Sequence, residues 1–170
     1  PHIRRYDERV VVNGAELKDE QLCESFRAVE AVRGDTSLTY FEFGTLSALW
    51  SFAQQRVDAC VLEIGLGGRL DAVNIAEPDV SVVTSIGLDH QAWLGDTLDD
   101  IAYEKISIGR RDQYLICGQP NPTPRAFETA SALGARWLCR DRDFFIEPDP
   151  AGLVLSFRHQ SEQVSWRLPA

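Results

Sequence analysis

The chain has 170 residues, contains no methionine and begins with proline, so we expect it to be a fragment of a longer protein. Hydrophobic residues make up 44% and charged residues 25% of the sequence. These values are ordinary for a globular protein and exclude a disordered or collagen-like chain. No apolar run reaches the roughly 20 residues of a transmembrane helix, so we expect no membrane association. The formal net charge of -9 disfavours binding to nucleic acid.

The N-terminal part predicts a hairpin followed by two helices. A β-run at residues 8–12 precedes Asn13-Gly14, a pair typical of a tight hairpin turn. Apolar residues recur at helical spacing over residues 19–32, and Gly34 is expected to end that helix. A second helix over residues 43–55 is predicted from the spacing of Leu46 and Leu49.

The middle of the chain predicts a parallel sheet. Two nearly continuous apolar runs, residues 59–64 and 80–86, indicate strands buried on both faces. A third strand is expected at residues 114–117. Between the second and third strands, Thr97 and Asp100 fit a capping box that opens a helix, which makes this stretch a βαβ unit. A further helix at residues 125–133 and a strand at residues 137–139 follow.

The C-terminal part predicts three short strands, at residues 144–147, 153–157 and 164–168, joined by turns as a small antiparallel sheet. The expected fold class is therefore α/β, with a mostly parallel sheet flanked by helices and a small antiparallel region near the C-terminus. The four cysteines lack a CxxC pair and lie mostly inside apolar runs. They are expected to be reduced packing residues, which favours a cytoplasmic location.

Polar side chains follow the first two predicted strands. Glu63 lies at the end of the first strand, before a glycine loop that starts at residue 65. His90 follows the second strand. Because the carboxyl ends of parallel strands meet at one edge, both are predicted to converge there and to bind a divalent cation. Mg²⁺ prefers oxygen ligands, although imidazole is a less usual ligand for it. In the alternative interpretation, the Glu63 carboxylate accepts hydrogen bonds from backbone N–H groups of the glycine loop, and His90 is a structural loop residue.

Lys105 lies on the apolar face of the helix predicted to begin near Thr97, four residues after Ile101. The usual explanation is that its stem packs on the apolar face while its charge stays in water. If the ammonium is instead buried, the neutral amine is favoured, and a neutral amine reacts with carbon dioxide.

The glycine loop after residue 64 also suggests a dinucleotide- or S-adenosylmethionine-binding turn. A lone GxG is weak evidence for such a turn. Those folds need a crossover helix before the next strand, and Gly67, Gly68 and Pro78 leave little room for one, which disfavours this interpretation. The sequence also contains no GxxxxGK[ST] phosphate loop.

Several stretches resemble, in order and spacing, the folylpolyglutamate synthases and dihydrofolate synthases of the Mur ligase superfamily. The likeness is strongest to the bifunctional bacterial members. It covers roughly the first two thirds of the chain, and the remaining residues match loosely. The matching stretches are residues 1–2, 8–10, 39–43, 62–72, 83–86, 89–90 and 94–95, with Ile101, Glu104 and Lys105.

The resemblance implies that residues 1–170 are part of a P-loop NTPase-like Mur ligase central domain. The phosphate loop is expected before Pro1 and a glutamate-binding domain after Ala170. The implied activity is an ATP-dependent ligase that adds L-glutamate to dihydropteroate or to tetrahydrofolate through an acyl phosphate. Its implied partners are these small molecules, with Mg²⁺ and ATP, and we expect a monomer. The fragment alone is expected to be inactive.

The resemblance also implies the site residues. The residues matching Glu63 and His90 bind Mg²⁺ in the family, and the one matching Lys105 is carboxylated on its amine, so Lys105 and His90 are the predicted catalytic residues. Departures from the family pattern are Val73, Ile106 and Ser107. The last two are the only hints of a competing interpretation, a binding module that keeps the fold without activity. Pteroate contacts are implied for Thr39, Tyr40, Phe41, Glu42, Leu70, Asp71 and Ala72.

Overall fold

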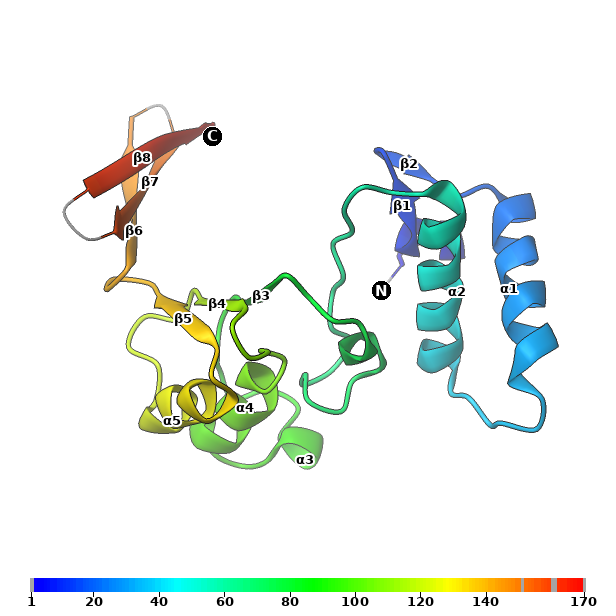
Figure 1. Cartoon of the computed structure of the whole chain (residues 1–170), viewed down its shortest axis with the longest axis horizontal. Coiled ribbons are helices and arrows are strands. Elements are labelled where there is room, and N and C mark those ends of the chain that lie inside the picture. Colours follow the sequence, from blue (N-terminus) through cyan, green and yellow to red (C-terminus); the bar gives the residue numbers. More distant parts are fainter. Residues whose placement is uncertain (1, 151, 160–161, 170) are drawn as a thin grey trace. The chain divides into compact units, whose positions relative to one another are not determined.

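The computed structural model describes residues 2–150, 152–159 and 162–169. The chain forms two compact units, Pro1–Gly65 and Leu66–Ala170 (Figure 1). Pro1 itself, one of the residues matched to the family, lies outside the described residues.

The first unit begins with the predicted hairpin. Strands β1 (Val11–Val12) and β2 (Ala15–Glu16) pair antiparallel, and Asn13 and Gly14 have φ of 51° and 80°, the left-handed values that a two-residue turn requires. The β-run is shorter than predicted because a 3₁₀ helix, η1 (Tyr6–Arg9), precedes it. The Glu8 carboxylate accepts the backbone N–H groups of residues 3–5, and these bonds hold the turn and lower the pKa of Glu8.

Two antiparallel helices, α1 (Asp19–Arg33) and α2 (Tyr40–Gln55), complete the first unit (Figure 1). Gly34 ends α1 with φ of 55°, as predicted. The helices approach closely through small residues, and the buried hydroxyls of Ser25 and Ser47 share a hydrogen bond of 2.5 Å. Leu22 of α1 joins a small core with residues of the hairpin segment.

The second unit contains the predicted βαβ arrangement. Strands β3 (Val80–Val83), β4 (Tyr114–Cys117) and β5 (Arg136–Cys139) form a parallel sheet in that order. Helix α4 (Leu98–Ile106) connects the first pair and helix α5 (Pro124–Leu133) the second, while the short α3 (Gln91–Leu94) precedes α4. The predicted capping box is present, because the Thr97 hydroxyl accepts the N–H of Asp100 at 3.1 Å.

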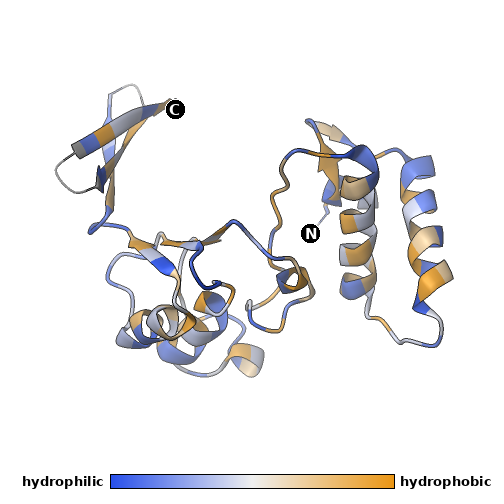
Figure 2. Ribbon diagram, in the orientation of Figure 1, coloured by the Kyte–Doolittle hydropathy of each residue, from blue (hydrophilic) through white to orange (hydrophobic). Residues whose placement is uncertain are grey.

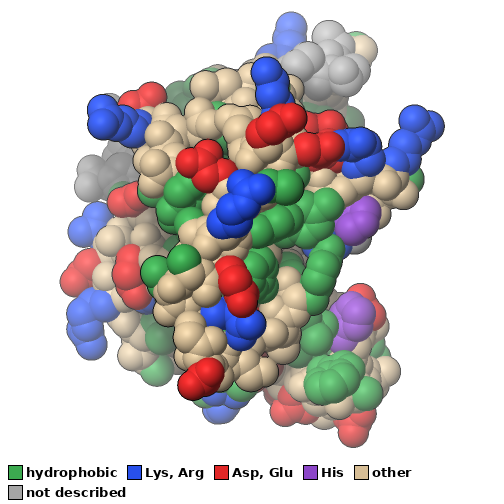
Figure 3. Space-filling view, turned by 90° about the vertical axis from the view of Figure 1, so that its right-hand side faces the viewer, with side chains coloured by type: hydrophobic (Ala, Val, Ile, Leu, Met, Phe, Trp, Pro, Cys, Tyr) green, Lys and Arg blue, Asp and Glu red, His purple; other side chains and the backbone are tan. Residues whose placement is uncertain are grey.

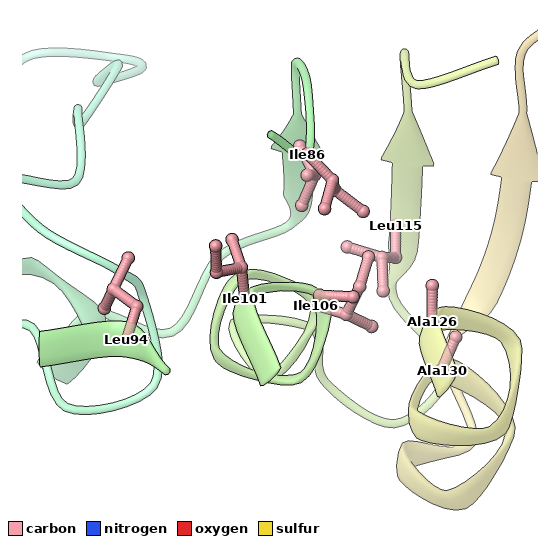
Figure 4. Packing of buried hydrophobic residues seen from close by; sticks show 9 residues of the cluster. Ile86, Leu94, Ile101, Ile106, Leu115, Ala126 and Ala130 are labelled. Carbon is pink, nitrogen blue, oxygen red and sulfur yellow. The ribbon is translucent and has the colours of Figure 1, made fainter. Parts of the chain in front are cut away.

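The core of the second unit lies between this sheet and helices α4 and α5. Ile101 and Ile106 of α4, Leu115 of β4 and Ala126 of α5 are all 0% exposed. Figure 4 shows their side chains pointing into the same layer. Burial of this apolar surface is the main force that holds the helices to the sheet.

Two predictions about the sheet are wrong. Residues 59–64 form no helix or strand, and Val61 is 95% exposed. An extended apolar segment becomes a strand only when a neighbour accepts its backbone hydrogen bonds, and none of the described strands pairs with it. Strand β3 is also buried on one face only, since Val80 and Val82 are 49% and 55% exposed.

The C-terminal sheet is antiparallel as predicted, with longer strands: β6 (Phe144–Asp149), β7 (Gly152–His159) and β8 (Glu162–Pro169). Because side chains alternate across a strand, its register gathers apolar residues on one face, where Trp166 is opposite Leu155 and Leu168 opposite Leu153. The opposite face carries the Ser156–Ser165 hydrogen bond and the Arg167–Asp149 ion pair. Hydrophobic and hydrophilic bands alternate along these strands in Figure 2.

The surface carries charges of both signs. Over most of the face drawn in Figure 3, acidic side chains lie beside basic ones. In the part of the chain that the structure describes, every helix is too short or too polar to cross a membrane.

The cysteines divide into two pairs. Cys117 and Cys139 are buried register partners on β4 and β5, as expected for packing residues. Cys23 and Cys60 are exposed, so the expectation of packing is wrong for them. For Cys60 the reason is that residues 59–64 lack the sheet neighbours that would have covered it.

This division predicts the order in which the thiols react. Burial raises the pKa of Cys117 and raises that of Cys139 to about 11, so both stay protonated and unreactive at neutral pH. In the folded chain at pH 7.5, we expect a disulfide reagent to label Cys23 and Cys60 rapidly, and Cys117 and Cys139 only after denaturation. Peptide mass mapping of the labelled sites checks this. Equal labelling of all four without denaturant would contradict the burial.

Candidate active site

Asp71 organises the glycine loop, residues 65–75. Its Oδ2 accepts the backbone N–H of Leu66 at 2.9 Å and its Oδ1 that of Val73 at 2.9 Å, which starts the 3₁₀ helix η2 (Ala72–Ile75). Because Val73 takes part through its backbone, its departure from the family pattern leaves this bond intact. Leu70 is 79% exposed. Of the loop residues with an implied pteroate contact, Leu70 therefore faces solvent, whereas Asp71 already folds the loop.

The glycine loop packs directly on helix α4. A Cβ built on Gly68 would lie 2.7 Å from the carbonyl oxygen of Glu104 and 3.3 Å from Cα of Lys105, so only glycine allows this approach. Arg69 donates its backbone N–H to the same carbonyl at 3.0 Å. The predicted pteroate loop and the helix that carries Lys105 thus share one packed contact.

Lys105 lies on α4 directly before the fully buried Ile106 and is half-buried. Among the described residues of its unit, its amine has neither a hydrogen bond nor an ion pair. Its carboxylation remains a prediction.

Ile106 and Ser107 have structural explanations. Ile106 is 0% exposed and packs in the core (Figure 4), so it extends the apolar stripe of α4. Ser107 closes the helix: its hydroxyl donates to the carbonyl oxygen of Tyr103 at 2.6 Å. The two residues that suggested a module without activity therefore serve the packing and the end of α4.

His90 has an unusual backbone. Its φ of 50° and ψ of 36° are left-handed, a conformation that costs a non-glycine residue free energy and is often found at functional sites. Asp89 accepts the backbone N–H of His90 at 2.8 Å, and its other oxygen lies 3.6 Å from Nε2 of the imidazole. The imidazole is 57% exposed, so it is not a buried packing histidine.

Glu63 lies in the first unit and His90 in the second. Glu63 is exposed and accepts no hydrogen bond from the described residues of its own unit. Its carboxylate has the donor chemistry that Mg²⁺ prefers, and the imidazole of His90 is a less usual ligand. Within either unit the described residues contain no cluster of three potential metal ligands. The joint metal site remains a prediction.

The segment from Thr39 to Glu42 forms the start of α2, which begins earlier than predicted. The Thr39 hydroxyl accepts the N–H of Glu42 at 3.2 Å, and Glu42 accepts the N–H of Thr39 at 2.7 Å. Hydrogen bonding of the Glu42 carboxylate to the Thr39 backbone N–H, and secondly to its hydroxyl, lowers the pKa of Glu42. Tyr40 is 65% exposed, and the Phe41 ring packs against Gly65. Thr39 and Glu42 thus have a capping role, while Tyr40 is open to solvent.

An open pocket of about 320 Å³ adjoins this helix start. Thr39 and Tyr40 are shared between the pocket lining and the predicted pteroate segment, so the pocket is consistent with that prediction. Its lining residues are Glu30, Arg33, Ser37, Leu38, Thr39, Tyr40 and Phe43.

The sequence pattern assigns no role to the side chains of Arg69 and Glu104. They form an ion pair of 2.9 Å, with the Glu104 side chain only 16% exposed. The one local signal is that Arg69 directly follows the glycine pair. Its partner is 35 residues away, so no helical or strand spacing could have identified it.

No protein-family model matches the chain. The dihydrofolate synthase/folylpolyglutamate synthase of Escherichia coli is 51% identical over 135 residues, which are 79% of this chain and 32% of that protein. The structure of E. coli FolC in complex with DHPP and ADP matches with a TM-score of 0.94 and 44% identity, covering 100% of this chain and 40% of that one. A bifunctional folylpolyglutamate synthase/dihydrofolate synthase with Mn, AMPPNP and L-glutamate bound matches with a TM-score of 0.88 and 43% identity, covering 96% and 39%.

The chain spans about a third of the length of the curated relatives it matches. The similarity in structure extends beyond the segment aligned in sequence and includes the C-terminal sheet, because it covers the whole chain. Sequence and structure thus agree: the chain is homologous to one segment of the dihydrofolate synthase/folylpolyglutamate synthases, which are Mur ligase-fold proteins.

Proposed function

We propose that this chain is part of an ATP-dependent ligase that joins L-glutamate to dihydropteroate, to tetrahydrofolate polyglutamate, or to both, through an acyl phosphate. The observation that carries the proposal is the match to E. coli FolC bound to DHPP and ADP, at 44% identity over the whole chain. An identity of 44% over the whole chain supports a shared chemistry rather than a shared fold alone.

In this proposal, residues of the glycine loop and of the start of α2 bind the pteroate. The pteroate ring system contacts Leu70, Ala72 and Tyr40. The side chains of Leu70 and Tyr40 are exposed and therefore available for this contact. Asp71 holds the loop in shape and contributes a contact of its own. Phosphate binding belongs to a part of the protein outside residues 1–170, as does the glutamate site.

Glu63 and His90 would hold Mg²⁺, whose chemistry here is to neutralise charge between phosphate groups. Lys105, carboxylated on its amine, would place an anion beside the reacting acyl phosphate or near a second cation. This role is supported by the contact between Lys105 and the glycine loop, and by an amine that has no partner among the described residues of its unit. Positioning and charge stabilisation are what phosphoryl-transfer chemistry mainly demands of a protein.

The proposed partners are small molecules only, and we propose a cytoplasmic monomer. The net charge of -9 opposes a polyanionic partner. The described cysteines are free thiols, which agrees with a reducing compartment.

The test is an E. coli FolC chimera in which this chain replaces the matching segment. With ATP, dihydropteroate and L-glutamate, we expect it to release phosphate in a glutamate-dependent reaction and to form the amide product, measured by mass spectrometry. The chain covers 40% of that structure with a TM-score of 0.94, so we expect the exchanged segment to fold as the original does.

The control is E. coli FolC with its own segment rejoined through the same junction residues. It separates the effect of the junctions from the effect of this chain. A chimera that is folded and binds ATP, but releases no phosphate in response to glutamate while the control does, would refute the proposed activity.

A further inference from the structure

Glu104 holds Arg69 at two points. Its carboxylate oxygen Oε1 accepts the Nε–H of Arg69 at 2.9 Å, and its backbone carbonyl accepts the N–H of Arg69 at 3.0 Å. The two residues therefore fix both the main chain and the side chain of the glycine loop to α4.

The backbone bond has a clear physical origin. The last carbonyl groups of a helix have no partner within the helix and must be satisfied from outside. Glu104 lies in the last turn of α4, which ends at Ile106, and Arg69 supplies the missing donor. The glycine loop thus caps the C-terminal end of α4 together with Ser107, and Gly68 allows its backbone to come this close.

The side-chain bond joins two charged groups that are partly shielded from water. The Glu104 side chain is 16% exposed and that of Arg69 is 39% exposed. A carboxylate taken largely out of water needs a charged donor, and hydrogen bonds between charged groups are about twice as strong as neutral ones. The Arg69 guanidinium also lies over the Tyr103 ring, 5.4 Å from its centroid, which limits its freedom.

The far end of the loop is attached separately. Arg110 donates to the backbone oxygen of Asn74 at 2.8 Å and to its side-chain oxygen at 3.1 Å, and it pairs with Glu77 at 3.0 Å. Glu77 is 77% exposed and lies away from Lys105 in the sequence. The chain therefore offers two Arg–Glu pairs at the glycine loop, of which only one is adjacent to Lys105.

We propose that Glu104 is a positioning residue: through Arg69 it locks the glycine loop to α4, so that the pteroate-contacting residues 70–72 and Lys105 keep one relative position. This inference rests on the proposed function, because it assigns those residues to one reaction. Loss of the lock lets the bound pteroate shift against the lysine, and a displacement of about 1 Å can cost about 100-fold in rate.

The test compares Glu104→Ala with Glu77→Ala in the active chimera. For Glu104→Ala we expect kcat/KM for dihydropteroate to fall about 10- to 100-fold, with a raised KM for dihydropteroate and an unchanged KM for glutamate. A merely structural role would lower the amount of active enzyme and leave both KM values alone. Glu104→Gln, which keeps an acceptor oxygen without the charge, is expected to recover part of the loss.

Glu77→Ala is the matched control, since it removes a carboxylate that also pairs with an arginine Nε at 3.0 Å. We expect it to leave kcat and both KM values unchanged. The double variant Arg69→Gln/Glu104→Ala should be no worse than either single change, because the two residues act as one unit. Independent, multiplying losses would overturn the inference.

A second measurement needs no activity. In the 170-residue chain, hydrogen exchange at the Arg69 amide is expected to quicken about 10-fold in Glu104→Ala and to stay unchanged in Glu77→Ala. Equal exchange rates at the Arg69 amide in the two variants would contradict the proposed role of Glu104, whatever the kinetic constants are. An inactive parent chimera would instead refute the proposed function, so the two failures are distinguishable.

Discussion

Lys105→Ala in the FolC chimera is expected to lower kcat by about 100- to 1000-fold, the usual cost of losing a group that stabilises charge in the transition state. If the lysine acts as a carboxylated anion, acetate or propionate should restore part of the rate by occupying the vacated space. Methylammonium, which replaces a bare ammonium, should not. The initial rate of phosphate release, measured at increasing concentrations of each added small molecule, distinguishes the two cases.

Lys18→Ala is the control for this experiment. Lys18 precedes α1 in the other unit, is exposed, and has no place in the proposed site. Its replacement should leave the rate unchanged. Rescue of Lys105→Ala by methylammonium and not by acetate would mean that Lys105 works as a cation, and the carboxylation hypothesis would be wrong.

Ile106→Ala is expected to lower the free energy of unfolding of the second unit by about 2–5 kcal/mol. Ile106 is 0% exposed and packs against the sheet, so its truncation leaves a cavity as well as losing buried apolar surface. Since a domain is stable by only about 5–15 kcal/mol, this is a large fraction of the total. Urea unfolding followed by circular dichroism measures the loss.

Two further variants test whether the loss of stability comes from the burial of Ile106. Ile106→Val removes a single methyl group and should cost about 0.5–1.5 kcal/mol, which stays measurable if the alanine variant unfolds. Leu98→Ala, on the same helix but at a site 42% exposed, should cost about 0.5 kcal/mol or less. Equal losses at positions 98 and 106 would show that Ile106 is not a core residue.

Local patterns predicted most elements of this fold. Helix α1 and strand β4 (Tyr114–Cys117) match their predicted positions closely, and the Asn13-Gly14 turn and the Thr97 capping box are present. Each depends on hydrogen bonds or side-chain spacing within a few residues, which the sequence displays directly. Helix α2 starts before its predicted position because the capping bonds of Thr39 and Glu42 begin it ahead of the apolar spacing.

The predictions that failed concern neighbours distant in the sequence. The run at residues 59–64 has strand composition, but a strand also needs a partner, and the described residues provide none. Cys60 is exposed for the same reason, whereas Cys117 and Cys139 are buried because β4 and β5 pair in register.

The sequence by itself determined the family resemblance, the order of the elements and the identities of the candidate residues Glu63, His90 and Lys105, because these are encoded in motifs of fixed spacing. Only the tertiary structure decided that the glycine loop caps α4 and that Arg69 and Glu104, 35 residues apart, form an ion pair. The physical reason is that a helix end and a loop become partners only when the chain folds back, and nothing local in either segment specifies the other.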